Sequence, residues 1–290
     1  MDKQAILIIA HNNIEILKKT LKLLDSKYFD FFIHIDKKSN IEYKDIKNCT
    51  KKSKIHFYKE IDIRWAHYSQ VECELFLIKK VLETKEKYEY LHLISGVDFP
   101  IKKAEEIYSF FHNNYGKEFV HFQDKELPKN KYEWIKYFRF MKNYRNNKII
   151  QKIEKTSLIT QKLLKINRIK NNKYKFMTGA NWFSITDDFA KYLISKETEI
   201  SKIFKYTKSA DEIFLQTILY NSKYKEKIYN QKYNNDYDSC KRLIDWNRGN
   251  PYVWKKEDKE IIEKSSCFFA RKFDYKTDRE IIEYLYNKLK

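Results

Sequence analysis

Short apolar runs alternate in the first half of the chain with longer segments in which apolar residues recur every three or four positions. QAILIIAHN is typical of a buried strand, and the next segment, IEILKKTLKLL (residues 14–24), has the period of an amphipathic helix. Further strand-like runs are FDFFIHID, KIHFY, YEYLHLIS and KEFVHF. SQVECELFLIKKVL (residues 69–82) predicts another helix, opened by a capping box between Ser69 and Glu72. This alternation predicts an α/β fold with a mostly parallel sheet flanked by helices, and ligand sites at the carboxyl ends of its strands.

The second half begins with a different kind of segment. Residues 130–175 are basic, aromatic and helical in pattern, which is typical of an insertion and not of a sheet strand. After it, NWFSIT predicts a strand, and DDFAKYLIS and DEIFLQTILYNS predict helices. The last fifty residues contain the strand-like KRLIDW, a helix that begins near Asp258, the short segment CFFARKFD and a final helix from about Asp278. With four Gly and three Pro in 290 residues, no flexible linker is expected, so the chain is predicted to form one compact unit.

Basic residues dominate the charge. The net charge is +19, and residues 129–175 hold fifteen Lys or Arg against two acids, Glu133 and Glu154. Such a segment can bind nucleic acid, anionic lipid or an anionic substrate, or its lysines can simply solvate helices. There is no RNA-binding or zinc-finger signature, so no nucleic-acid partner is expected.

Several classes of chemistry lack their motifs. There is no Gly-rich phosphate loop, no H-E-x-x-H and no G-x-S-x-G. The cysteines lie far apart and form no C-x-x-C pair: Cys49, Cys73, Cys240 and Cys267. No signal peptide or apolar stretch of membrane-spanning length is present, which favours a cytoplasmic location.

Glycine is scarce, and three of the four glycines lie in polar, aromatic segments at the ends of predicted elements: SGVDFP, TGANWF and DWNRG. Each is expected to mark tight backbone geometry, although SGVDFP also suits an ordinary turn.

Two acidic motifs have more than one interpretation. In SADEIF, Ser209 and Glu212 have the spacing of a capping box, yet Glu212 also suits a catalytic base. Asp236-Tyr237-Asp238 matches a metal-binding D-x-D, but it follows the SADEIF helix instead of a mid-sheet strand.

These segments together resemble the Core-2/I-branching N-acetylglucosaminyltransferase family, glycosyltransferase family 14, which includes the peptide-O-xylosyltransferases. The resemblance is carried, in order, by FFIHIDKKS, RWAHYSQVECELFLIKKVL, YEYLHLISGVDFPIK, GANWFSITDDFAKYL, SADEIFLQTIL, KRLIDW and FFARKFD. It implies a GT-A fold and an inverting transfer from a UDP-sugar, with basic side chains in place of a metal, so no metal or other cofactor is expected. It also implies a nucleotide-binding part over residues 1–125, the insertion over 126–175 and a phosphate- and acceptor-binding part over 176–290.

The family's functional residues carry over by motif. The resemblance implies Glu212 as the base, and Arg242 and Lys272 as ligands of the diphosphate. It implies a nucleoside site formed by Asp36, Ala10 and His11, and a pocket for the donor sugar formed by Gly96, Asp98, Trp182, Asp211 and Trp246. One departure is Ala210, where the family usually has proline before the Asp-Glu pair.

The expected function is therefore β-linked transfer of a sugar, most simply N-acetylglucosamine from UDP-GlcNAc, to a saccharide or lipid-linked saccharide in bacterial surface polysaccharide or lipopolysaccharide synthesis. A UDP-xylose or UDP-galactose donor is the alternative within the class, and a non-catalytic basic membrane- or nucleic-acid-binding protein is the alternative outside it. The basic segment 130–175 could dock on an anionic inner membrane surface.

Overall fold

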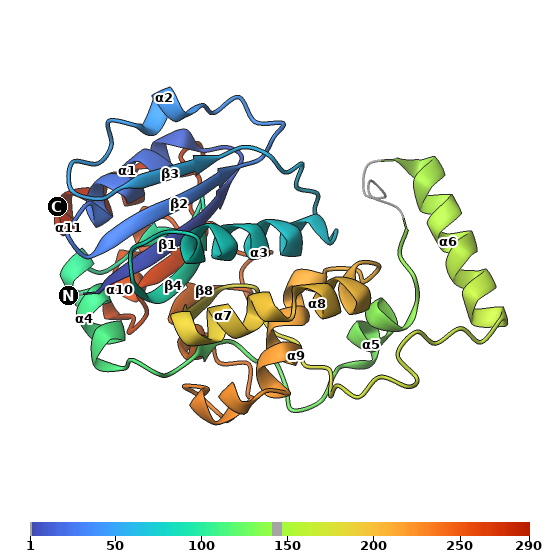
Figure 1. The fold of residues 1–290 in the computed structure, drawn as a ribbon. Helices are drawn as coiled ribbons and strands as arrows, with labels where there is room; N and C mark the ends of the chain where they lie inside the picture. The colour runs from blue at the N-terminus through green and yellow to red at the C-terminus, as the bar shows by residue number, and fades with distance from the viewer. Residues whose placement is uncertain (1, 141–146) are drawn as a thin grey trace.

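The computed structural model describes residues 2–140 and 147–290, and its centre is a six-stranded sheet (Figure 1). The strand order is β3-β2-β1-β4-β7-β6. The strands are β1 (Lys3–Ala10), β2 (Phe29–Ile35), β3 (Ile55–Tyr58), β4 (Tyr88–Ser95), β6 (Phe119–Val120) and β7 (Phe183–Thr186). β1 to β4 pair in parallel, whereas β7 runs antiparallel to both β4 and β6. The predicted α/β arrangement with a mostly parallel sheet is confirmed.

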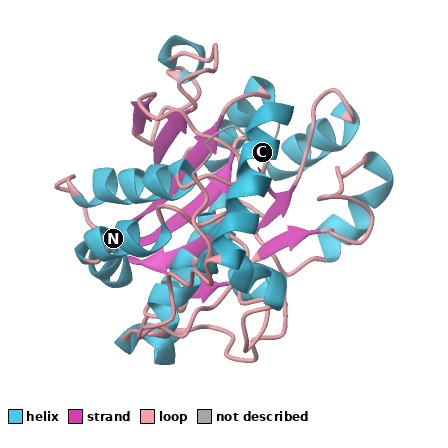
Figure 2. Cartoon of the chain, turned by 90° about the vertical axis from the view of Figure 1, so that its right-hand side faces the viewer, coloured by secondary structure: helices cyan, strands magenta, loops and turns pink. Residues whose placement is uncertain are grey.

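Helices cover both faces of this sheet, as the cyan helices around the magenta strands show in Figure 2. Successive side chains of a strand point to opposite faces, so β1 needs apolar partners on both sides. Leu7 belongs to the core shared with α3 (Ser69–Leu82), α7 (Asp187–Ser195) and α9 (Phe214–Tyr220). Ile6 and Ile8 belong to a second core with α1 (Ile14–Leu24) and α4 (Ala104–Asn113).

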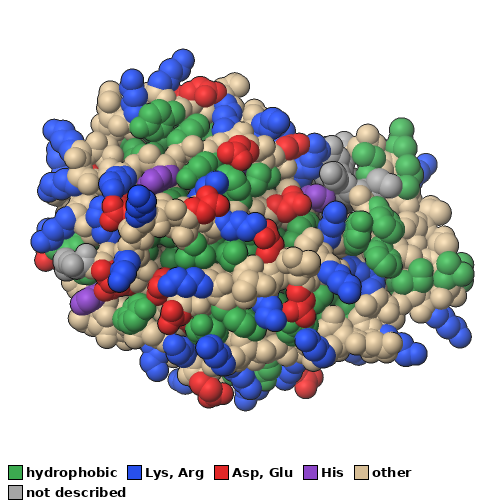
Figure 3. All heavy atoms as spheres, in the orientation of Figure 1, with side chains coloured by type: hydrophobic (Ala, Val, Ile, Leu, Met, Phe, Trp, Pro, Cys, Tyr) green, Lys and Arg blue, Asp and Glu red, His purple; other side chains and the backbone are tan. Residues whose placement is uncertain are grey.

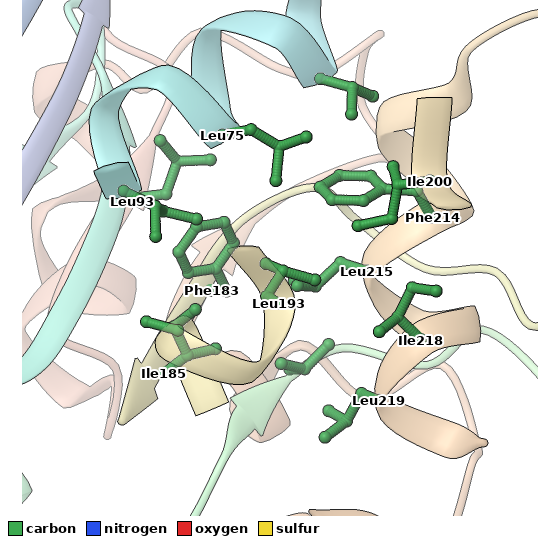
Figure 4. Close-up of a cluster of buried hydrophobic side chains, with 14 of the residues drawn as sticks. Leu75, Leu93, Phe183, Ile185, Leu193, Ile200, Phe214, Leu215, Ile218 and Leu219 are labelled. Atoms are coloured by element: carbon green, nitrogen blue, oxygen red, sulfur yellow. The ribbon is translucent and has the colours of Figure 1, made fainter. Parts of the chain in front are cut away.

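The first of these cores holds the segment that carries Glu212. Figure 4 shows side chains from α3, β4, β7, α7, α8 (Glu197–Phe204) and α9 packed together. Phe214, Leu215, Ile218 and Leu219 of α9 are all buried there. Because α9 is anchored on its apolar face, the short 3-10 turn η2 (Ala210–Glu212) directly before it has a fixed position.

A smaller three-stranded sheet has the order β5-β9-β8 and is formed by β5 (Phe99–Pro100), β9 (Phe269–Arg271) and β8 (Arg242–Ile244). It has its own core with α10 (Lys259–Lys264) and α11 (Arg279–Leu289). Phe99 pairs with Ala270, so this sheet places the SGVDFP turn beside the FARKF segment, which lies far away in the sequence.

The predicted insertion contains the helices α5 (Lys129–Lys136) and α6 (Lys148–Leu163), and its described residues contain no strand. Part of the insertion, residues 141–146, lies outside the described residues. Among the helices of the described ranges, α6 included, none combines the length and apolar character that crossing a bilayer requires.

The remaining elements are short. They are α2 (Tyr43–Ile46) and the 3-10 turns η3 (Lys223–Lys227), η4 (Tyr237–Cys240) and η5 (Lys256–Asp258). The capping box predicted for α3 is wrong: Tyr68 precedes the helix, and the Ser69 hydroxyl accepts a hydrogen bond from the Arg64 N–H, which lies outside the helix.

Candidate active site

A cavity of about 710 Å³ lies at the edge of the main sheet where the parallel strands end. Its wall is built mainly from segments that follow β6, β8 and β9, precede β7, or form η2. The lining residues are Trp65, Gln70, His121, Gln123, Lys131, Gly179, Ala180, Asn181, Trp182, Asp211, Glu212, Asn235, Tyr237, Trp246, Asn250, Pro251, Arg271 and Lys272. Two carboxylates and three cations thus face one space.

Glu212 reaches this cavity from η2, and its backbone is tightly held. Its carbonyl oxygen accepts hydrogen bonds from the Gly179 N–H (3.0 Å) and the Thr178 hydroxyl (2.9 Å). A Cβ on Gly179 would lie 1.9 Å from the carbonyl oxygen of His121, so only glycine fits at this point. Gly179 of TGANWF therefore allows its own segment to lie directly against the backbones of His121 and Glu212. This is the tight backbone geometry that the sequence predicted for this glycine.

The capping-box interpretation of SADEIF is wrong. Ser209 has a left-handed backbone (φ 45°) and makes no side-chain hydrogen bond to the turn. The Glu212 side chain instead forms an ion pair with Lys131 of α5. The Lys131 ammonium also lies 3.9 Å from the ring centre of Trp134, and its side chain is mostly buried. The insertion thus contributes a cation to the cavity that sequence reasoning did not single out.

Behind Glu212, acidic side chains continue into the protein. Asp211 is buried, and one of its carboxylate oxygens accepts a hydrogen bond from the Gln70 amide (3.1 Å). Burial, followed by the charge of Glu212, raises the pKa of Asp211 to about 7. Burial and then the charge of Asp211 raise the pKa of Glu74 well above its usual value. The Glu74 carboxyl is therefore harder to ionise than an ordinary glutamate, and Asp211 titrates near pH 7.

Arg271, at the end of β9, is the second residue that sequence reasoning missed. Its guanidinium donates to Asp98 (2.8 Å) and lies 4.5 Å from the ring centre of Trp182. The same Asp98 carboxylate accepts from the Ser95 N–H (2.7 Å) and the Ser95 hydroxyl (2.9 Å). Asp98 is buried and is not among the residues lining the cavity, so the aspartate predicted for the donor pocket holds Arg271 in place.

Lys272, which follows Arg271, also lines the cavity, as its predicted role requires. The dibasic pair in FARKF was a signal available in the sequence, because neighbouring residues at a strand end can both reach one site when the strand stops there. Arg271 and Lys272 give this wall of the cavity two positive charges.

Arg242 does not take the position that its predicted role requires. It is 1% exposed and is absent from the cavity lining. Its guanidinium donates to the carbonyl oxygens of Cys240 (2.7 Å), Phe183 (2.9 Å) and Leu93 (3.1 Å). Arg242 therefore joins β8 to β4 and β7 of the main sheet, and the structure does not bring it together with Lys272.

The residues predicted for the nucleoside lie close together on the same edge of the sheet, outside the lining of this cavity. The Asp36 N–H donates to the Ala10 carbonyl (2.8 Å), and the Gly96 N–H donates to the carbonyl of Ile9 (3.0 Å). A Cβ on Gly96 would lie 2.5 Å from the Cβ of Ala10, so this close approach needs glycine. Asp36 accepts from the Lys38 N–H (2.9 Å), and His11 is exposed. Their nucleoside role stays a prediction.

Aromatic side chains form much of the remaining wall. Trp182 is buried beneath Arg271, whereas Trp246 is about half exposed at the cavity. Tyr237 stacks on His121 with ring centres 4.1 Å apart. His121 accepts a hydrogen bond from the Ala180 N–H through Nδ1, and burial lowers the pKa of His121 to about 4. The imidazole is therefore neutral at pH 7.

Asp236 and Asp238, the alternative metal-binding D-x-D pair, are both engaged in contacts within their own segment. The Asp236 carboxylate accepts from the Asp238 N–H and so caps η4, while Asp238 pairs with Lys241 (2.7 Å). Both carboxylates thus have local partners, and among the described residues no group of three or more His, Cys, Asp or Glu side chains is arranged to hold a metal ion.

Comparisons of the sequence with known proteins identify the same family that the sequence motifs resemble. The family model described as "Branch: Core-2/I-Branching enzyme" matches residues 5–266. Xylosyltransferase 2 of Rattus norvegicus is 23% identical over 301 residues, a match that covers 97% of this chain and 33% of the relative. Xylosyltransferase sqv-6 of Caenorhabditis briggsae is 24% identical over 295 residues, covering 92% and 34%. The chain thus spans about one third of the length of these relatives.

A comparison of structures finds the apo crystal structure of mouse xyloside xylosyltransferase 1, with a TM-score of 0.43 and 8% sequence identity. That match covers 93% of this chain and 97% of the mouse chain.

Proposed function

Because this chain belongs to the Core-2/I-branching enzyme family, we propose that it is an inverting glycosyltransferase with Glu212 as its base. One observation carries the proposal: Glu212 and the cations Arg271 and Lys272 line the same cavity. A sugar transfer needs a carboxylate near the attacking hydroxyl and positive charge near the departing diphosphate. The cavity has both.

In the proposed reaction, Glu212 removes the proton of an acceptor hydroxyl. The hydroxyl oxygen forms a bond to the anomeric carbon while the bond from that carbon to the UDP oxygen breaks on the opposite side. UDP leaves with the bonding electron pair, and Arg271 and Lys272 stabilise the charge of its phosphates. The configuration at the anomeric carbon is inverted by this single displacement, which gives the β-linkage.

In this proposal Arg271, and not Arg242, binds the diphosphate together with Lys272. The Asp98 carboxylate and the Trp182 ring fix the guanidinium in advance, so little side-chain entropy is lost when a phosphate binds. Two preorganised cations can take the place of a divalent metal, and we propose that transfer is metal-independent. Full activity in EDTA is expected, and activity abolished by EDTA and restored by manganese would contradict this part.

The donor sugar has two candidates. UDP-GlcNAc is the donor first suggested by the family, and UDP-xylose is favoured by the curated relatives, whose names describe xylosyltransferases. We propose a saccharide acceptor, in bacterial surface polysaccharide synthesis on the cytoplasmic side.

A panel of UDP-sugars, scored by thermal shift and by release of UDP, tests the proposal. A ligand that binds the native state raises the melting temperature, so the true donor gives the largest shift. The Glu212→Gln variant should bind the donor like wild type yet lose activity by about 10²–10⁴-fold, the usual contribution of a general base. Near-wild-type turnover by this variant would remove Glu212 from its role, and no shift with any UDP-sugar would favour a non-catalytic binding protein.

A further inference from the structure

Helix α6 has its polar side toward the protein and its apolar side toward solvent. The buried residues of this helix are Glu154 and Gln161. The Gln161 side chain donates to the Phe138 carbonyl and accepts from the Phe138 N–H, and Glu154 pairs with Arg139 (3.4 Å). A helix that served only to cover the core would show the opposite arrangement.

The outward side carries large aliphatic side chains. The exposed fractions are 70% for Ile149, 47% for Ile153, 51% for Ile159, 77% for Leu163 and 67% for Leu164, which directly follows the helix. At 3.6 residues per turn these five positions fall within an arc of roughly 140°. The helix is about 24 Å long at 1.5 Å per residue. Within the arc, the exposed Lys152, Thr156 and Thr160 lie between the aliphatic side chains. We call these five residues the α6 stripe.

Lysines border the stripe. The helix contains four lysines and one glutamate, and Lys148, Lys152 and Lys155 are exposed. By helical position, Lys148 and Lys155 fall on one flank of the stripe, and Lys152 falls within its arc, between Ile159 and Leu163. In Figure 3 hydrophobic side chains gather on the right-hand projection formed by the insertion, beside blue lysines. An apolar stripe with lysines along its edge is the pattern of a helix lying in the interface of an anionic bilayer.

The insertion also joins this surface to the site. Lys131 of α5 pairs with Glu212 in the cavity, and the main-chain segment that follows α5 is tied to α6 through Phe138 and Gln161. A surface that held α6 would therefore contact the same insertion that contributes Lys131 to the cavity.

We propose that the α6 stripe inserts into the headgroup region of an anionic membrane and so presents the cavity to an amphiphilic, lipid-linked acceptor. The membrane contact stands on the α6 stripe and its lysines alone, whereas the acceptor clause rests on the proposed function. The observations favour a bilayer over the other candidate occupants. RNA would use the lysines and leave five aliphatic side chains in water, and a second copy would set the basic flank of one α6 near another of the same charge.

Flotation of the full chain with vesicles tests the membrane contact. We expect the wild type to float with vesicles of phosphatidylcholine and phosphatidylglycerol, and less with phosphatidylcholine alone, with binding weakened by salt. The Ile153→Asn, Leu163→Asn double variant should lose at least about tenfold in partitioning, because two side chains that insert become polar. The matched control is Ile261→Asn, which changes an isoleucine of α10 with 51% exposure and should float like wild type.

Absence of flotation with either vesicle would overturn the proposal, as would equal flotation of the double variant. Loss of a wild-type dimer in the double variant, seen by sedimentation without vesicles, would also overturn it in favour of a second copy. The UDP-induced thermal shift reports on the donor site separately. A double variant that keeps this shift and loses flotation supports the proposal, while a wild type that floats but gives no shift with UDP contradicts only the proposed transferase.

Discussion

Replacing Arg271 and Arg242 one at a time by methionine distinguishes a residue that binds ligand in the cavity from a residue that stabilises the fold. Methionine removes the charge and the donors of each arginine while keeping a long apolar side chain. Arg271→Met should weaken UDP binding and leave binding of uridine unchanged, because uridine has no phosphate. Arg242→Met should leave UDP affinity unchanged in the folded protein and lower its stability.

The magnitudes follow from the contacts. A charge-assisted hydrogen bond contributes about 1.5–3 kcal/mol, so loss of the Arg271 contact to phosphate should raise the Kd for UDP about 10- to 150-fold. In Arg242→Met, the carbonyl oxygens of Cys240, Leu93 and Phe183 lose their donor. Each buried group left without a partner costs about 1–3 kcal/mol, which gives a loss of about 3 kcal/mol or more. At about 2–4 °C per kcal/mol, the Tm should fall by about 6–12 °C.

Isothermal titration with UDP and uridine gives the affinities, and thermal unfolding gives the stabilities. UDP affinity of Arg271→Met equal to that of wild type would exclude a phosphate contact by Arg271. An Arg242→Met variant that keeps its Tm and binds UDP tenfold more weakly would contradict a purely structural role for Arg242. The second result would restore the role that the family motif implied for Arg242.

Two further predictions concern the floor of the cavity. Gly179→Ala should destabilise the protein by about 1–3 kcal/mol or more and reduce transfer, because the new methyl group would overlap the His121 carbonyl. Gly116→Ala is the control: its Cβ meets nothing within 4 Å and only its backbone (φ 93°) is strained, so a larger loss of stability for this variant in urea unfolding would contradict a packing role for Gly179. Because burial raises the folded-state pKa of Asp211 from 3.8 to about 7, its contribution to stability is present at acid pH and is lost as the pH rises from about 4 to 7. Asp211→Asn should therefore flatten that part of the stability–pH curve, and an unchanged slope in urea unfolding at several pH values would show that the group titrates normally.

Much of the fold could be predicted because its patterns are local. The segments 14–24 and 69–82 have a helical period along their whole length, and both form helices over those residues. The apolar strands β1, β2 and β4 are buried on both faces, which a continuous apolar run indicates. The family prediction is likewise confirmed by the match over residues 5–266. The predicted capping boxes were wrong because S-x-x-E is a short pattern. Ser69 instead accepts a hydrogen bond from the Arg64 N–H, and Glu212 pairs with Lys131.

The site was less accessible to sequence reasoning, because its contacts join distant segments. Nothing local distinguishes Arg242, whose guanidinium meets three carbonyls in the interior, from Arg271, whose guanidinium meets Asp98 at the cavity. The sheet pairing of β5 with β9 creates the second contact, and that pairing is not visible as a sequence pattern. Lys131 lies in the part of the chain where the family resemblance is weakest, so no motif pointed to it.

The pairing of Lys131 with Glu212 has a consequence for the order of events. While the Lys131 ammonium stays paired with Glu212, the carboxylate is a weaker base. It therefore activates a water molecule poorly as a nucleophile. In the proposed reaction, the hydroxyl groups of an acceptor would have to displace the Lys131 ammonium before the Glu212 oxygen can take a proton. Under the proposed function, the Lys131–Glu212 pair would therefore slow hydrolysis of the donor until an acceptor binds.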